Sequence, residues 1–159
     1  MKKVLFSLLT MMLILTSCGA DVVNFNDTIV KEEKSLEAPL IAYSSKLGQS
    51  MSSNSYEGIK DLGDSLLLKI DKSIEVVKNL TAPSGGDKFK EISIEYLESI
   101  KKIVTIGNKA ESLGSEPTDE QVAALNEEYE QITKEITEKT NAYLTTQKEF
   151  AKEKGMKLQ

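Results

Sequence analysis

The residues of this chain that could do chemistry are carboxylates and lysines. Its 159 residues include 25 acidic and 20 basic side chains, every basic one a lysine, and neither histidine nor arginine occurs. This composition excludes Ser-His-Asp triads, His-bearing zinc or di-iron sites and bidentate guanidinium clamps for phosphate. Paired carboxylates could still cleave a glycan or bind calcium. The sequence contains no calcium-loop, glycine-rich phosphate-loop or G-x-S-x-G motif. We therefore predict a non-enzymatic protein without a metal or cofactor.

The single cysteine, Cys18, follows a segment with the features of a secretory signal. Lys2 and Lys3 precede an apolar run that ends in small residues. The run is shorter than the roughly 20 residues that a membrane-spanning helix needs. Its last residues, Leu15-Thr16-Ser17-Cys18, resemble the lipobox of bacterial lipoproteins. The resemblance implies that residues 1–17 are a cleaved signal peptide, and that Cys18 carries a diacylglycerol and an acylated amino terminus, palmitate being the expected acyl group.

A lipid on Cys18 would determine where the protein resides. Two or three acyl chains form a durable membrane anchor, since each buried methylene adds about 0.8 kcal/mol. The expected location is thus the bacterial cell envelope. Gly19 follows the cysteine, where an aspartate commonly retains lipoproteins in the inner membrane; in a Gram-negative source its absence favours the outer membrane. The alternatives are a plain secreted protein and an uncleaved anchor.

The mature chain is acidic. Without Lys2 and Lys3, 18 lysines face 25 acidic residues, a net charge of −7. Such a chain lacks the basic stripe of nucleic-acid-binding proteins, so nucleic acid is not an expected partner. With Cys18 committed to lipid, no disulfide is available, and the fold must be held together by packing alone.

Four segments repeat apolar residues every three or four positions, the pattern of amphipathic helices. After a short lipidated tether at 18–22, the helices are expected at residues 23–48, 55–81, 87–113 and 119–154. The third should be the most buried, because apolar residues flank both sides of its main stripe. Comparable lengths joined by short turns indicate antiparallel neighbours. We predict an all-α fold: one up-down-up-down four-helix bundle at residues 23–159, preceded by the signal peptide.

Local signals define most of the predicted helix ends. Pro39 should kink or break the first helix without ending it, and residues 48–53 read as a turn. Asn54 with Glu57, and Thr118 with Gln121, have capping-box spacing at the starts of helices two and four. Gly114 should end helix three. The apolar stripe of helix four runs from Val122 to Phe150.

Two charged residues fall on apolar faces. Glu33 lies between Ile29 and Leu36 on helix one, and Lys139 interrupts the stripe of helix four. If these helices are neighbours, the two side chains should approach each other near the membrane-proximal half. Such groups could pair, line a small pocket or reach water.

These observations favour a cell-envelope lipoprotein whose helical bundle is an interaction or structural module. The segment Phe25-Asn26-Asp27-Thr28-Ile29-Val30 resembles small helical-bundle surface lipoproteins of spirochaetes and Bacteroidetes. The expected partners are the membrane, through the lipid on Cys18, and an envelope protein of unknown identity. The alternative is a carrier that binds an apolar small molecule or lipid between its helices, which requires an unfilled cavity of about 300 Å³ or more.

Overall fold

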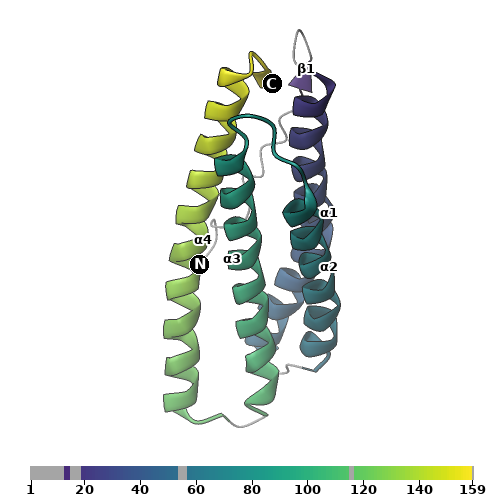
Figure 1. Cartoon of the computed structure of the whole chain (residues 1–159). Coiled ribbons are helices and arrows are strands. Elements are labelled where there is room, and N and C mark those ends of the chain that lie inside the picture. Colours follow the sequence, from purple (N-terminus) through teal and green to yellow (C-terminus); the bar gives the residue numbers. More distant parts are fainter. Residues whose placement is uncertain (1–12, 15–18, 54–56, 115–116, 159) are drawn as a thin grey trace.

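The computed structural model describes residues 13–14, 19–53, 57–114 and 117–158. Its helices are α1 (Ala20–Ser53), α2 (Ile59–Asn79), α3 (Asp87–Ser112) and α4 (Asp119–Glu153). Two short strands, β1 (Leu13–Ile14) and β2 (Lys157–Leu158), pair antiparallel. Consecutive helices run in opposite directions along one long bundle (Figure 1). The predicted all-α, up-down-up-down four-helix fold is confirmed.

The two ends of the bundle differ in what they contain. At the basal end, α1 begins, α4 ends and residues 80–86 connect α2 to α3 (Figure 1). At the apical end, α1 is followed by α2, and α3 is followed by α4. The strand pair lies at the basal end, and β1 falls within the predicted signal peptide.

The helices pack in chain order: α1 against α2, α2 against α3, and α3 against α4. Helix α3 packs against both α2 and α4 and also contacts α1, and it has the largest share of buried residues, as predicted. By contrast, no described residue of α1 has its Cα within 8 Å of a Cα of α4. We call the boundary between these two helices the α1–α4 seam. Contact across it depends on side chains alone.

Helix α1 is longer than predicted at both ends. It begins at Ala20, so part of the expected 18–22 tether is helical, and Val22 packs against the core. It continues through Pro39 without a break, because Leu36 and Leu40 stay buried on both sides of the proline. The predicted turn at 48–53 is wrong. Burial of Leu47 and Ser50 on one face offsets the low helix propensity of glycine and serine there.

Helix α2 is shorter than predicted. It begins at Ile59, whose side chain is fully buried, and ends at Asn79. Gly58 occupies the N-cap position with φ 77°, a left-handed conformation that glycine adopts without steric cost. Asn54, the proposed capping residue, lies outside the described residues.

The boundaries of α3 and α4 agree with the predicted ones to within one residue. The capping box is present: Gln121 N donates to Thr118 Oγ1 at 3.2 Å, and Thr118 N donates to Gln121 Oε1 at 2.9 Å. Gly114, with φ 78°, follows the last turn of α3 and supplies the predicted helix stop.

Candidate functional site

The proposed lipidation residue, Cys18, lies outside the described part of the chain. The next residue, Gly19, directly precedes α1, and its carbonyl accepts a hydrogen bond from Val22 N at 3.0 Å in the first turn. Only Gly19 therefore separates Cys18 from Ala20, the first helical residue. A group attached to Cys18 would be held close to the basal end of the bundle.

Glu33 is buried at the α1–α4 seam, with 7% of its surface exposed. Burial raises the pKa of its carboxyl from 4.5 to about 8, and the nearby Tyr143 hydroxyl opposes this rise. Burial and the Glu33 charge in turn raise the pKa of Tyr143 well above its ordinary value. Neither Glu33 Oε1 nor Tyr143 Oη has a partner of ordinary hydrogen-bond geometry among the described residues. Near pH 7, Glu33 is therefore mainly a neutral acid.

Lys139 does not approach Glu33 as predicted. Its Nζ lies 2.6 Å from Oε2 of Glu95, a residue of α3, and the Lys139 side chain is 33% exposed. This interaction raises the pKa of Lys139. The expected pairing fails because α4 packs directly against α3 rather than α1. Tyr143, one turn beyond Lys139, is the α4 residue that meets Glu33.

At the basal end, side chains close the α1–α4 seam. The rings of Phe25 from α1 and Phe150 from α4 have centroids 5.6 Å apart in an edge-to-face arrangement. Phe89 of α3 contacts both rings, at 6.1 and 5.6 Å. Buried Gln147 donates to Asn26 Oδ1 at 3.4 Å. These large residues span a helix–helix distance that smaller side chains would leave open.

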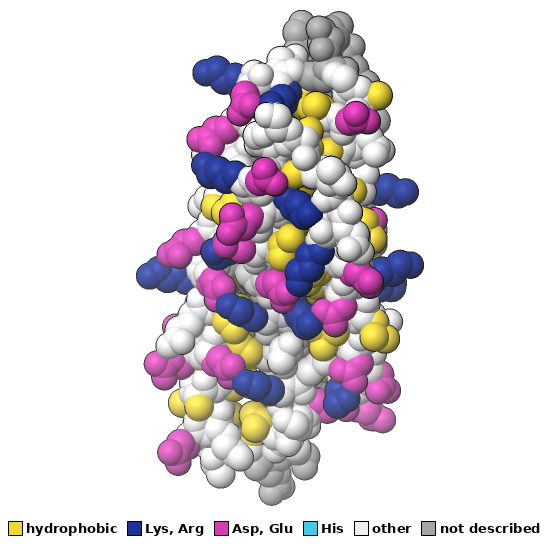
Figure 2. All heavy atoms as spheres, viewed as in Figure 1, with side chains coloured by type: hydrophobic (Ala, Val, Ile, Leu, Met, Phe, Trp, Pro, Cys, Tyr) yellow, Lys and Arg dark blue, Asp and Glu magenta, His cyan; other side chains and the backbone are white. Residues whose placement is uncertain are grey.

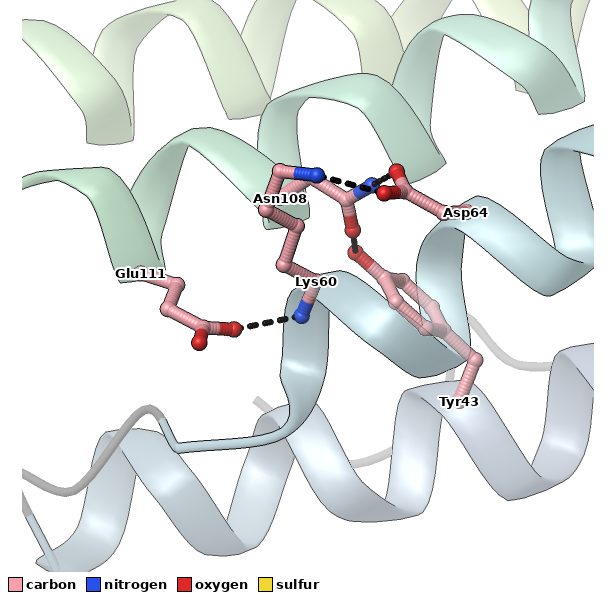
Figure 3. Close-up of polar contacts among 5 residues, drawn as sticks. All are labelled: Tyr43, Lys60, Asp64, Asn108 and Glu111. Atoms are coloured by element: carbon pink, nitrogen blue, oxygen red, sulfur yellow. Dashed lines mark hydrogen bonds and ion pairs between the residues drawn. The ribbon is translucent and has the colours of Figure 1, made fainter.

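A polar network towards the apical end links α1, α2 and α3 (Figure 3). The Tyr43 hydroxyl lies 2.9 Å from the Val104 carbonyl and 3.2 Å from Asn108 Oδ1. The Asn108 amide then donates to Asp64 Oδ1 at 2.9 Å. Burial raises the pKa of the Tyr43 hydroxyl, so it remains a hydrogen-bond donor. The network links α1, α2 and α3 near their apical ends.

A second contact joins the start of α2 to the end of α3. The backbone N–H of Lys60 donates to Glu111 Oε2, and the Lys60 ammonium pairs with Asp64 (Figure 3). None of the five residues drawn in Figure 3 was predicted from the sequence to form a site. The sequence feature that could have indicated these contacts is a glycine inside each of two neighbouring helices, Gly63 in α2 and Gly107 in α3. A Cβ at Gly63 would overlap the Asn108 amide, and one at Gly107 would overlap the Tyr43 hydroxyl.

The apical half of α4 is the least covered part of the bundle. Its predicted core positions form what we call the apical stripe: Val122, Leu125, Tyr129, Ile132 and Ile136. None of the five is fully buried; Val122 is 39% and Tyr129 37% exposed. The same face becomes buried only from Tyr143 onward. The reason is that α3 covers one side of the stripe, while α1 is too distant to cover the other.

Charged residues of both signs are interspersed over the face seen in Figure 2. Ion pairs join α3 to both of its neighbours, as in Lys101 with Asp71 and Lys102 with Glu135. Within the described part of the chain, no three metal-binding side chains form a group suited to an ion. None of the described helices is both long and apolar enough to span a bilayer.

Comparisons with known proteins returned no relatives. No protein-family model matches the chain, and searches among curated proteins and solved structures found no significant similarity.

Proposed function

We propose that the protein is a lipid-anchored component of the bacterial cell envelope, and that its helical bundle is a non-enzymatic interaction module. Support for the anchor comes from the resemblance of residues 15–18 to a lipobox and from the short connection between Cys18 and α1. Cleavage before Cys18 would remove β1 and leave β2 without its paired strand. In a Gram-negative cell, Gly19 favours the outer membrane as the destination.

The arrangement of the helices supports a role in contacting other molecules. A lipid on Cys18 would place the basal end at the membrane, and the apical end would then point away from it (Figure 1). Helix α4 has 35 residues, which span roughly 52 Å at 1.5 Å per residue. The apical stripe would thus lie well above the lipid headgroups. This partly exposed apolar surface, distant from the anchor, is the observation that carries the proposed interaction role.

One observation favours the carrier as a second candidate. The α1–α4 seam is held by side chains only, so it is the boundary along which the bundle could admit an apolar molecule. Mass spectrometry of organic extracts from the purified protein tests this function. A stoichiometric lipid or apolar metabolite in the extract would support the carrier function. Extracts without such a molecule would exclude it.

The anchor is tested by changing Cys18 to Ala in the expressing bacterium. We expect wild-type protein to incorporate labelled palmitate and sediment with membranes, and the Cys18→Ala variant to do neither. Retention of the variant in the membrane fraction, as firm as that of wild type, would refute lipid anchoring.

The interaction role is tested by cross-linking in intact cells, followed by identification of adducts. We expect a defined envelope protein to be cross-linked through apical residues. Adducts restricted to the basal end, or none above background, would contradict an interaction module.

A further inference from the structure

Glu33 lies where the closed part of the α1–α4 seam ends. Towards the basal end, aromatic rings and the Asn26–Gln147 hydrogen bond join the two helices. Glu33 follows Asn26 by seven residues, about 10 Å further along α1. Tyr143, which meets Glu33 from α4, is the last buried residue of α4 in the apical direction, and the partly exposed apical stripe lies beyond it. Glu33 and Tyr143 therefore form the apical edge of the closed seam.

No cation balances the buried carboxyl of Glu33. Lys139 of α4 lies 2.6 Å from Glu95 of α3, and no other lysine of the described residues forms an ion pair with Glu33. On the side of α2, the Ser73 hydroxyl donates to Glu32 at 2.8 Å rather than to Glu33. An ionised Glu33 would thus be a buried charge without a counter-ion.

The other ionisable groups that face Glu33 are Tyr143 of α4 and Tyr96 of α3, whose stacked rings have centroids 5.4 Å apart. Burial and the Glu33 charge raise the pKa of both tyrosines, so both hydroxyls stay neutral while Glu33 titrates. Within α1, Glu37 follows one turn later and is itself acidic. Glu33 is thus the buried group of this cluster whose charge changes between about pH 4.5 and 8.

We propose that Glu33 is a proton-dependent switch that keeps the α1–α4 seam closed when its carboxyl is protonated and opens the seam when it ionises. A buried carboxylate without a counter-ion is stabilised by reaching water. Separation of α1 from α4 gives it that access at the least cost, because these two helices have no backbone contact, whereas α3 packs directly against α2 and α4. The released proton goes to solvent. This regulation is independent of the lipid anchor and of the proposed interaction role.

The open fraction should rise with pH, because the closed form binds one more proton than the open form. The rise is at most about tenfold per pH unit between about pH 4.5 and 8. Glu33→Gln should abolish it. The Tyr143 hydroxyl lowers the pKa of Glu33, so Tyr143→Phe should extend the rise to higher pH than in wild type.

The test measures the distance between α1 and α4 by electron–electron resonance of paired spin labels. The full chain carries Cys18→Ala, so that only introduced cysteines react, and the labels are attached at Ala38→Cys and Asn141→Cys, two exposed positions. A control pair at Lys72→Cys and Thr105→Cys, also exposed, spans α2 and α3. We expect a longer α1–α4 distance component that grows from pH 5 to pH 9, and no change in the control pair.

The variants are compared in the same labelled background, and circular dichroism at each pH establishes that the helices persist. Glu75→Gln, at an exposed position on α2, is the matched control for Glu33→Gln and should open like wild type. If Glu33→Gln does not fold, the displaced profile of Tyr143→Phe decides.

Four results would overturn the proposal. The first is an α1–α4 distance that stays constant from pH 5 to pH 9, and the second is equal opening of Glu33→Gln and wild type. Equal widening of both label pairs would assign the effect to unfolding of the whole bundle. A Tyr143→Phe profile identical to that of wild type would contradict the contact across the seam on which the switch depends.

Discussion

At the scale of single residues, Glu33 is the ionisable group whose environment is least favourable to its charged form. The carboxyl is buried at the α1–α4 seam, where its Oε1 lacks a partner of ordinary hydrogen-bond geometry among the described residues. Burial disfavours the charged form, so the native state holds the proton that an unfolded chain would release above pH 4.5. Ionisation of Glu33 opposes folding.

The stability of the protein should therefore fall as pH rises from about 4.5 to about 8, the interval between the unfolded and folded pKa values of Glu33. The native state binds more protons than the unfolded state in this range. The contribution of Glu33 to the slope is at most about 1.4 kcal/mol per pH unit, and it levels off above pH 8. Glu33→Gln retains the shape of the side chain and removes the titration.

Urea unfolding between pH 5 and 9 measures this effect. We expect a flatter profile for Glu33→Gln and a higher free energy of unfolding than wild type at pH 9. Glu75→Gln, at an exposed position on α2, is the control and should follow the wild-type profile. Parallel curves for wild type and Glu33→Gln would show that the carboxyl is solvated in the native protein.

At the scale of helices, Gly63 determines how closely α2 approaches α3. It is buried, and a Cβ there would overlap the side chain of Asn108. Asn108 joins Tyr43 of α1 to Asp64 of α2. One glycine thus makes room for a hydrogen-bond network that links three helices.

Gly63→Ala should destabilise the protein by about 1–3 kcal/mol, because the Asn108 amide must move away and lose its hydrogen bonds with Tyr43 and Asp64. The helix-propensity gain of up to about 1 kcal/mol from replacing glycine would offset part of the loss. Gly48→Ala is the matched control, since a Cβ at Gly48 in α1 has no neighbouring atom within 4 Å. We expect Gly48→Ala to be neutral or stabilising in thermal and urea unfolding. If both alanine variants behave alike, the close approach at Gly63 has no energetic role.

The ends of α3 and α4 could be predicted because local chemistry determines them. The Thr118–Gln121 capping box and the left-handed Gly114 act within a few residues of the helix end. The C-terminal end of α1 could not be predicted, because burial of Leu47 and Ser50 outweighs the local turn signals. The Glu33–Lys139 pairing was wrong for a similar reason. Periodicity places both residues on inner faces, but it does not determine which helix each one meets.

The network around Tyr43 was beyond sequence reasoning for a further reason. Tyr43, Asp64 and Asn108 are far apart in the chain, and each is of a common type at an unremarkable position. Their contact depends on the relative rotation of three packed helices. The sequence feature associated with this network is a glycine within a helix. Such a glycine can permit close packing of two helices, but a helix can also contain one without any packing role.

At the scale of the whole molecule, the bundle is closed at one end and loosely covered at the other. Aromatic rings from α1, α3 and α4 fill the basal seam. Towards the apical end, α4 is covered on one side by α3, and its apolar stripe remains partly exposed. Local stability follows the density of buried apolar contacts. It should therefore decrease along α4 from Glu153 at the basal end to Asp119 at the apical end.

Native-state hydrogen exchange measures this gradient directly. We expect the amides of residues 122–136 to exchange faster than those of residues 143–153, because opening the apical half of α4 exposes little buried surface. The central part of α3 is the internal control; it is buried between two neighbours and should stay protected. Uniform protection along α4 without any ligand would show that the apical seam is closed in solution, and would remove the surface on which the proposed interaction depends.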